Sequence, residues 1–125
     1  MYAAISPRDL DKFYPVRFVV NTHHWTTRIS KDQAYLMKLD FNNLARKVDS
    51  EKEFFIRNNK LICIENPEKE IFILNDAQIR FMTDDEEFVD ELQDIWITGR
   101  VNLLCRDILS RYRLVYSKDG VWLER

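Results

Sequence analysis

The chain has two histidines, His23 and His24, and they are adjacent. Imidazole can act as a general acid, a general base or a metal ligand near neutral pH. Neighbouring residues of a strand face opposite ways, so two adjacent histidines would not readily share one metal ion. No cysteine or carboxylate stands beside them at ligand spacing. A turn with two surface histidines is the favoured interpretation, and a small hydrolase or nuclease that uses His23 or His24 is the alternative.

The two cysteines are predicted to be inert core thiols. Cys63 lies in the apolar run LICIE, and Cys105 follows Leu103 and Leu104 in an apolar pattern. Nucleophile and phosphate-binding motifs such as GxSxG, GxGxxG and GxxxxGK[ST] do not occur, and the chain contains only two glycines. We therefore predict a protein that is not an enzyme, with no catalytic residue, no metal site and no cofactor.

The most distinctive local feature is a run of carboxylates that begins at Asp84. Carboxylates in the first turn of a helix stabilise it through the helix dipole, so a solvated acidic helix face is one interpretation. A divalent cation site is another, although the run lacks the glycine and the alternating spacing of an EF-hand loop. The third is a docking face for a protein with a basic surface, formed by Asp84, Asp85, Glu87, Asp90, Glu91 and Asp94.

Basic and aromatic residues follow the acidic run and suggest an alternative function. Arginines interleaved with aromatic rings can bind phosphates and stack on the bases of single strands or RNA. Pairing of these arginines with the chain's own acids is the competing interpretation. The predicted nucleic-acid surface consists of Arg100, Arg106, Arg111, Arg113, Tyr116 and Trp122.

The charge is small in total but uneven along the chain. The formal net charge is −2, whereas residues 1–50 carry +3, residues 51–95 carry −8 and residues 96–125 carry +3. Complementary segments of this kind suit association with a basic partner or self-association in a homodimer. The balance does not resemble the strongly basic balance of a dedicated DNA-binding domain.

Helices are predicted at four places. Ser6, followed by Pro7 and Asp9, is typical of a helix start, and Pro15 would end that helix. Ser30 and Gln33 form a capping box before an amphipathic helix over 30–48. Thr83 and Glu86 form a second box before a helix over 84–97, and a further helix, or a continuation, is predicted over 101–112.

Strands are predicted between and after these helices. The ranges 16–21 and 22–29 are β-prone. A meander is predicted over 53–82, with turns at Asn58-Asn59, at residues 66–69 and at Asn75-Asp76. The chain is expected to end in a hairpin around 118–120.

These elements predict one α+β domain over residues 1–125. Its expected core is an antiparallel β-meander sheet packed against the central amphipathic helix, with further helices before the C-terminal β-hairpin. No apolar run approaches the ~18–20 residues that span a membrane, and the N-terminus lacks a signal-peptide pattern, so a cytoplasmic protein is expected. We predict a small regulatory adaptor or inhibitor, and its size and few glycines are compatible with an accessory protein of a phage or mobile element.

Overall fold

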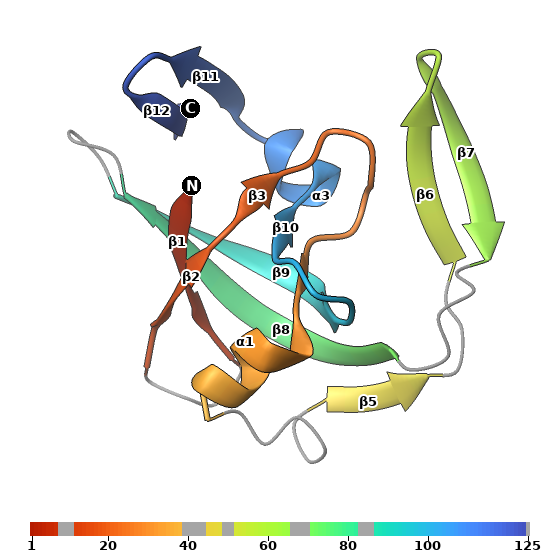
Figure 1. Cartoon of the computed structure of the whole chain (residues 1–125), viewed down its shortest axis with the longest axis vertical. Helices are drawn as coiled ribbons and strands as arrows, with labels where there is room; N and C mark the ends of the chain where they lie inside the picture. The colour runs from red at the N-terminus through yellow and green to blue at the C-terminus, as the bar shows by residue number, and fades with distance from the viewer. Residues whose placement is uncertain (8–11, 39–44, 49–51, 66–70, 83–86, 125) are drawn as a thin grey trace.

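The structure, a computed structural model, describes residues 1–7, 12–38, 45–48, 52–65, 71–82 and 87–124. This part of the chain is mostly β, and its helices are the short α1 (Lys31–Leu36) and α3 (Arg106–Leu109) (Figure 1). The predicted α+β class, with a sheet on a central helix and further helices behind it, is therefore wrong. A curled mixed sheet takes the place of that arrangement.

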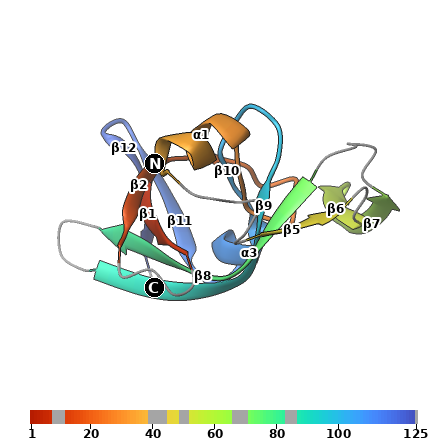
Figure 2. The same ribbon diagram turned by 90° about the horizontal axis from the view of Figure 1, so that it is seen from below.

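Two long antiparallel strands form the spine of the sheet. Strand β8 (Ile71–Met82) pairs with β9 (Glu87–Ile97) from Phe72↔Ile97 to Met82↔Glu87. The register is the same on both sides of Asp76, whose φ of 56° is left-handed. The predicted turn at Asn75-Asp76 is thus a bend within one strand. Figure 2 shows the pair curving beneath the other elements.

The bend at Asp76 divides the second edge of β8 between two neighbours. Strand β5 (Ala45–Val48) pairs with residues 71–74, and β1 (Tyr2–Ser6) pairs with residues 78–80. Strand β2 (Tyr14–Arg17) then pairs with β1. The two strands on this edge of β8 therefore pair with separate segments of it, one on each side of the bend.

Short strands extend the sheet beyond the end of β9. Strand β4 (Arg28–Ile29) runs parallel to β9 through Arg28↔Trp96 and Ile29↔Ile97. Strand β10 (Leu103–Leu104) pairs antiparallel with β4 and parallel with β3 (Val19–Val20). The sheet order is β2-β1-β8-β9-β4-β10-β3, with β5 also on β8.

Two hairpins stand apart from this sheet, and both were predicted. Strands β6 (Lys52–Arg57) and β7 (Lys60–Glu65) pair around Asn58-Asn59, whose φ values of 51° and 60° fit a two-residue hairpin turn. Strands β11 (Arg113–Ser117) and β12 (Gly120–Glu124) pair around Lys118-Asp119, and Gly120 has a φ of 139°.

The core lies on one face of the curled sheet. It combines residues of β8 and β9 with residues of β1, β2 and β4 and with Ala34 and Met37 from the α1 region, and on β8 the core positions shift across Asp76 from 72 and 74 to 77, 79 and 81. Its large buried side chains include Ile5, Phe18, Ile29, Leu74, Ile79, Ile95 and Ile97. A smaller cluster of Ile71, Ile73 and Trp96 is buried separately. Consecutive burial at Ile95, Trp96 and Ile97 shows that this end of β9 is covered on both faces.

The predicted helix over 30–48 begins as expected but ends early. The Gln33 backbone N–H donates to the Ser30 hydroxyl oxygen at 3.0 Å, as the capping box predicted. The helix ends at Leu36, and Lys38 has a left-handed φ of 54°, a conformation that ends helices. Residues 39–44 are outside the described residues, and 45–48 form strand β5 rather than helix.

The later predicted helices are also wrong for the most part. Residues 87–97 form β9, and the capping box at 83–86 lies outside the described residues. Within 101–112, Leu103–Leu104 is a strand and α3 covers only Arg106–Leu109. At the N-terminus Ser6 ends β1 instead of capping a helix, and 8–11 are not described. Long-range pairing with β8 overrode the local helical spacing.

The bend in β8 can be tested at Asp76. Valine at a left-handed position places its branched Cβ against the backbone, so Asp76→Val should lower the free energy of unfolding by about 1–2 kcal/mol. Asp76→Gly should cost less than Asp76→Val, because glycine tolerates this conformation. Urea denaturation measures both. Gln78→Val, at an exposed position of the same strand, is the control. Equal stability of Asp76→Val and Asp76→Gly would contradict the bend.

Candidate functional site

The β6–β7 hairpin projects from the body of the protein. Figures 1 and 2 both place it at one side, with β6 nearer the body and β7 outermost. Leu61 is 59% exposed and Ile64 is 44% exposed, and Cys63 between them is exposed as well. An isolated two-stranded hairpin is marginally stable in water, so this one depends on what holds its base.

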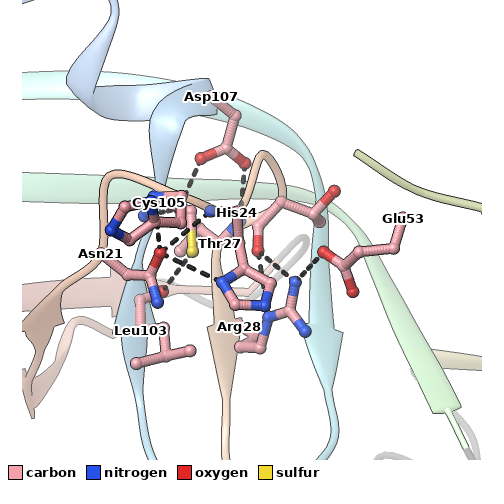
Figure 3. Close-up of polar contacts among 10 residues, drawn as sticks. Asn21, His24, Thr27, Arg28, Glu53, Leu103, Cys105 and Asp107 are labelled. Carbon is pink, nitrogen blue, oxygen red and sulfur yellow. Dashed lines mark hydrogen bonds and ion pairs between the residues drawn. The ribbon is translucent and has the colours of Figure 1, made fainter. Parts of the chain in front are cut away.

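A buried ion pair joins the hairpin to the main sheet. The guanidinium of Arg28, on β4, donates to the carboxylate of Glu53, on β6 (Figure 3). Arg28 is 7% exposed and Glu53 is 2% exposed. A buried charge is tolerated only when it is paired and hydrogen-bonded. The pair therefore fixes where β6 sits relative to β4.

The Arg28 side chain has further partners that hold it in place. Its Nε and Nη2 donate to the backbone oxygen of Thr26 at 3.2 and 3.1 Å. Its guanidinium carbon lies 4.9 Å from the centre of the Trp96 ring, in a cation–π arrangement. Because Trp96 belongs to the small cluster on β8 and β9, Arg28 connects that cluster to the hairpin.

The segment 21–27 holds β6 through its backbone. The Trp25 N–H donates to the Phe54 oxygen at 2.9 Å, and the Ile56 N–H donates to the His23 oxygen at 2.7 Å. The segment thus behaves as a third strand on the edge of β6 that faces away from β7. One edge of the hairpin is occupied by the body of the protein, and in the part of the chain that the structure describes no strand pairs with the outer edge of β7.

The same segment is fastened to β10 and α3 by Thr27 and Asp107. Thr27 donates its backbone N–H to the Asp107 carboxylate at 2.9 Å and its hydroxyl to the other carboxylate oxygen. The Thr27 hydroxyl oxygen accepts the Cys105 N–H at 3.0 Å. Asp107 also accepts the N–H of Ile108 at 2.8 Å. Figure 3 shows Asp107 and Glu53 on opposite sides of this segment.

Asn21 shapes the start of the segment. Its side-chain oxygen accepts the backbone N–H groups of His23 and His24, each at 2.9 Å, and lies 3.1 Å from His24 Nδ1. The backbone oxygens of His24 and Trp25 accept the N–H groups of Arg106 and Asp107 at 3.1 and 2.8 Å. We call residues 21–28 together with Glu53, Cys105 and Asp107 the polar anchor.

The electrostatics of the polar anchor indicate a structural role. Burial, and then the positive charge of Arg28, lower the pKa of His24, so its neutral form is favoured. Burial raises the pKa of the Cys105 thiol to about 12, which keeps it protonated. Burial also raises the pKa of Asp107, while the hydrogen bonds from Thr27 and Ile108 act in the opposite direction. No activated nucleophile results.

The described residues do not contain a candidate metal site. Among them no group of three or more His, Cys, Asp or Glu side chains could hold a metal ion. His24 directs one ring nitrogen at Asn21, and the Asp107 carboxylate is already used by Thr27 and Ile108. These groups organise the backbone of the anchor.

The predicted acidic docking face is not a helix face. Asp84 and Asp85 lie outside the described residues, and Glu87, Asp90, Glu91 and Asp94 lie in strand β9. These four positions belong to one long strand of the sheet, so they do not form the helix face that the sequence predicted.

The predicted nucleic-acid residues are spread over several elements. Arg100 is exposed before β10, Arg106 is half-buried in α3, and Arg111 is exposed after it. On the last hairpin Arg113 pairs with Glu124, and the Trp122 indole N–H donates to Glu124 at 3.2 Å.

Tyr116 is 65% exposed. Its place in the β11–β12 register puts it on the face opposite Arg113 and Trp122. The aromatic rings of this hairpin therefore do not form one stacking surface with its arginine.

Sequence reasoning missed the anchor because its members are far apart in the chain. Arg28 and Glu53 are 25 residues apart, and Thr27 and Asp107 are 80 apart. Cys63 was expected in the core but is exposed, whereas the prediction of a buried Cys105 is confirmed. One signal was available for the hairpin: β7 is apolar at every position between Lys60 and Glu65, which is unusual for a two-stranded hairpin.

Comparison of the chain with protein-family models, with curated proteins and with solved structures gave no match in any of the three. Among the described residues, no helix has the length and the apolar composition that a membrane crossing requires.

The buried pair predicts a strongly non-additive double-mutant cycle. Glu53→Leu leaves the Arg28 charge buried without its carboxylate and should lower the free energy of unfolding by about 3–5 kcal/mol. Adding Arg28→Met should restore a large part of that loss, because both charges are then gone. Urea denaturation measures the four proteins, and hydrogen exchange at residues 52–65 reports the hairpin. Additive losses would show that the pair is not coupled.

His24 predicts a dependence of stability on pH. Burial and the charge of Arg28 hold the folded-state pKa of His24 below the ordinary histidine value of 6.5, so the unfolded chain binds the proton more readily. The contribution of neutral His24 is present above that value and is lost as the pH falls through the lowered pKa. The free energy of unfolding should therefore decrease between about pH 7.5 and 5.5.

His24→Gln should flatten this part of the pH profile, and His23→Gln, at the exposed neighbouring position, should leave it unchanged. Asp107 has a raised pKa and acts with the opposite sign, but it is present in all three proteins and cancels in their difference. An unchanged slope in His24→Gln would refute the assignment.

Proposed function

We propose that this protein is a non-enzymatic protein-interaction domain and that the β6–β7 hairpin is its binding element. The observation that carries the proposal is the apolar edge strand β7, with Leu61 59% and Ile64 44% exposed, projecting from the body. Edge strands of this kind pair with other chains unless charges, prolines or bulges prevent it. Strand addition is a common mode of peptide recognition, in which the main chain supplies affinity and the side chains supply specificity.

The polar anchor supports the proposal because it fixes the hairpin before any partner binds. The Arg28–Glu53 ion pair and the backbone bonds from Trp25 to Phe54 and from Ile56 to His23 hold β6 against the body. Binding elements that are already ordered lose less conformational entropy on association. A buried ion pair is costly to desolvate and gives little net stability, so its use to orient an exposed hairpin favours a role for that orientation.

The partner that we propose contacts a strand rather than an acidic helix face. The acids of β9 do not form the predicted helix surface, so the basic partner inferred from it is not proposed again. We place the domain in the cytoplasm, as the sequence led us to expect. The exposed free thiol of Cys63 suits a reducing compartment, where such thiols persist.

The nucleic-acid alternative has less support. Arg113 and Trp122 both engage Glu124, and Tyr116 lies on the other face of that hairpin. Arginines that are paired within the chain contribute less to phosphate binding, which depends on releasing counterions from the nucleic acid.

The proposal predicts that one exposed side chain of the hairpin controls partner capture. Affinity capture from extracts of the native host should be compared for the wild type, Ile64→Lys and Val101→Lys. Val101 is 49% exposed outside the hairpin and provides a matched control. Ile64→Lys should retain less than about a tenth of the captured partner, because a lysine disrupts apolar strand contact, whereas Val101→Lys should retain it.

The captured protein must then bind the purified domain directly with the same pattern of variants. Equal capture by Ile64→Lys and the wild type, with both proteins folded, would remove the hairpin as the binding element.

A further inference from the structure

The hydrogen-bond directions along β7 follow from the contacts of β6. Phe54 and Ile56 direct their backbone groups at Trp25 and His23, hence away from β7. Their register partners on β7 are Cys63 and Leu61. In an antiparallel pair such residues also direct their N–H and C=O groups outward. Leu61, Cys63 and, by the same alternation, Glu65 therefore present their backbone groups on the free edge.

Three other strand edges among the described residues are protected, namely those of β2, β3 and the first part of β9. Pro15 interrupts the donors of the edge strand β2, and β3 has only two residues. The part of β9 before β4 carries Glu87, Asp90, Glu91 and Asp94, and charges of one sign repel an added copy. β7 has no proline, and its charged residues are confined to its two ends, Lys60 and Glu65.

We propose that the occupant of this edge is the β7 strand of a second copy, paired antiparallel about a two-fold axis at Cys63. This identifies the partner in the function proposed above and rests on it. In this register Cys63 faces Cys63 of the second copy, and Leu61 faces Glu65. Each facing pair exchanges both N–H···O bonds, so every outward backbone group from residue 61 to residue 65 gains a partner.

The side chains of β7 match this register. Residues directly opposite in an antiparallel pair share a face, and here Ile62 stands opposite Ile64 of the second copy. The two-fold axis repeats the contact, which gathers both isoleucines of both chains into one apolar group. Ile64 is 44% exposed in the single chain, and this contact removes that surface from water.

The charges of β7 also favour a copy of itself. Lys60 stands at one end of the strand and Glu65 at the other. In the antiparallel register Glu65 stands opposite Leu61 of the second copy, one position from Lys60, so ends of opposite charge lie near each other although the two side chains are on different faces, while a parallel arrangement would bring like ends together. A strand with one sign of charge throughout would repel its own copy, so this distribution distinguishes a second copy from an unrelated acidic or basic peptide.

The proposed dimer can be tested by measuring the molecular mass in solution over a range of protein concentrations. An interface of one strand pair is small, so the 15.1 kDa chain should approach twice its mass only above roughly 10–100 μM. Ile64→Lys should remain a monomer at concentrations about tenfold higher. Val101→Lys, at an exposed apolar position elsewhere, should behave as the wild type.

Cys63→Pro provides an independent test of the backbone pairing. The N–H of residue 63 points away from β6, so proline removes an outward donor and spares the bonds within the hairpin. We expect this variant to keep the urea midpoint of Ile64→Lys within the error of the measurement and to lose dimerisation.

The register is tested with dibromobimane, which becomes fluorescent when two thiolates each displace one bromide. The wild type should form a covalent dimer through Cys63, because facing residues lie about 5.5 Å apart between Cα atoms. Cys105 is buried with a pKa raised to about 12 and should not react. In Cys63→Ser/Leu61→Cys the two thiols lie about 13 Å apart along the strands, so cross-linking should be lost.

A monomer at all concentrations would overturn the inference, as would a dimer that Ile64→Lys and Cys63→Pro leave intact. Equal cross-linking from positions 61 and 63 would overturn the register. A strict monomer whose captured partner is still lost in Ile64→Lys would overturn the dimer alone and leave the interaction function standing.

Discussion

The placement of the β6–β7 hairpin depends on one buried interaction, the contact of the Arg28 guanidinium with the Glu53 carboxylate. Arg28 lies on β4, which is between β9 and β10 in the sheet, and its contact with the Trp96 ring ties it to β9. Glu53 lies near the start of β6. A charge at either position would be expensive to bury alone, so the two strands must meet at this point. The backbone of segment 21–27 is hydrogen-bonded to β6 through Trp25 and His23 and to α3 and β10 through His24, Trp25 and Asn21.

Local turn chemistry was the part of the fold that the sequence predicted well. Asn58-Asn59 adopts the left-handed conformation that a two-residue hairpin needs, Gly120 closes the last hairpin, and Ser30 caps α1. Each of these outcomes is decided by residues within a few positions of one another. The failures occurred where long-range pairing decides. The residues of β9 satisfy helical spacing, yet β8 offers them a strand partner along their whole length.

The candidate site was less predictable than the fold, for the same reason. Thr27, Arg28, Glu53 and Asp107 are ordinary residues in sequence, and their meaning appears only when β4, β6 and α3 are brought together. Attention to charge runs selected the acids of β9 and the arginines near the C-terminus. A run of like charges indicates a solvent-exposed segment. A binding edge is indicated by apolar residues that remain exposed in the folded protein, which the sequence alone does not show. Cys63 illustrates the difference, because its apolar neighbours suggested burial in the core and the structure exposes it.

The two edges of the hairpin have different roles, although both strands are rich in apolar residues. Phe54 and Ile56 on β6 have their outward backbone groups taken by Trp25 and His23, so that edge is part of the folded body. Cys63 and Leu61 stand opposite them on β7 with the same alternation of backbone groups, but β7 is the strand farther from the body. A second segment of the chain along β7 would have made the hairpin an interior part of the sheet. Because the segment 21–27 covers one edge among the described residues, the apolar outer strand β7 is the edge at which we propose that a strand from a second copy binds.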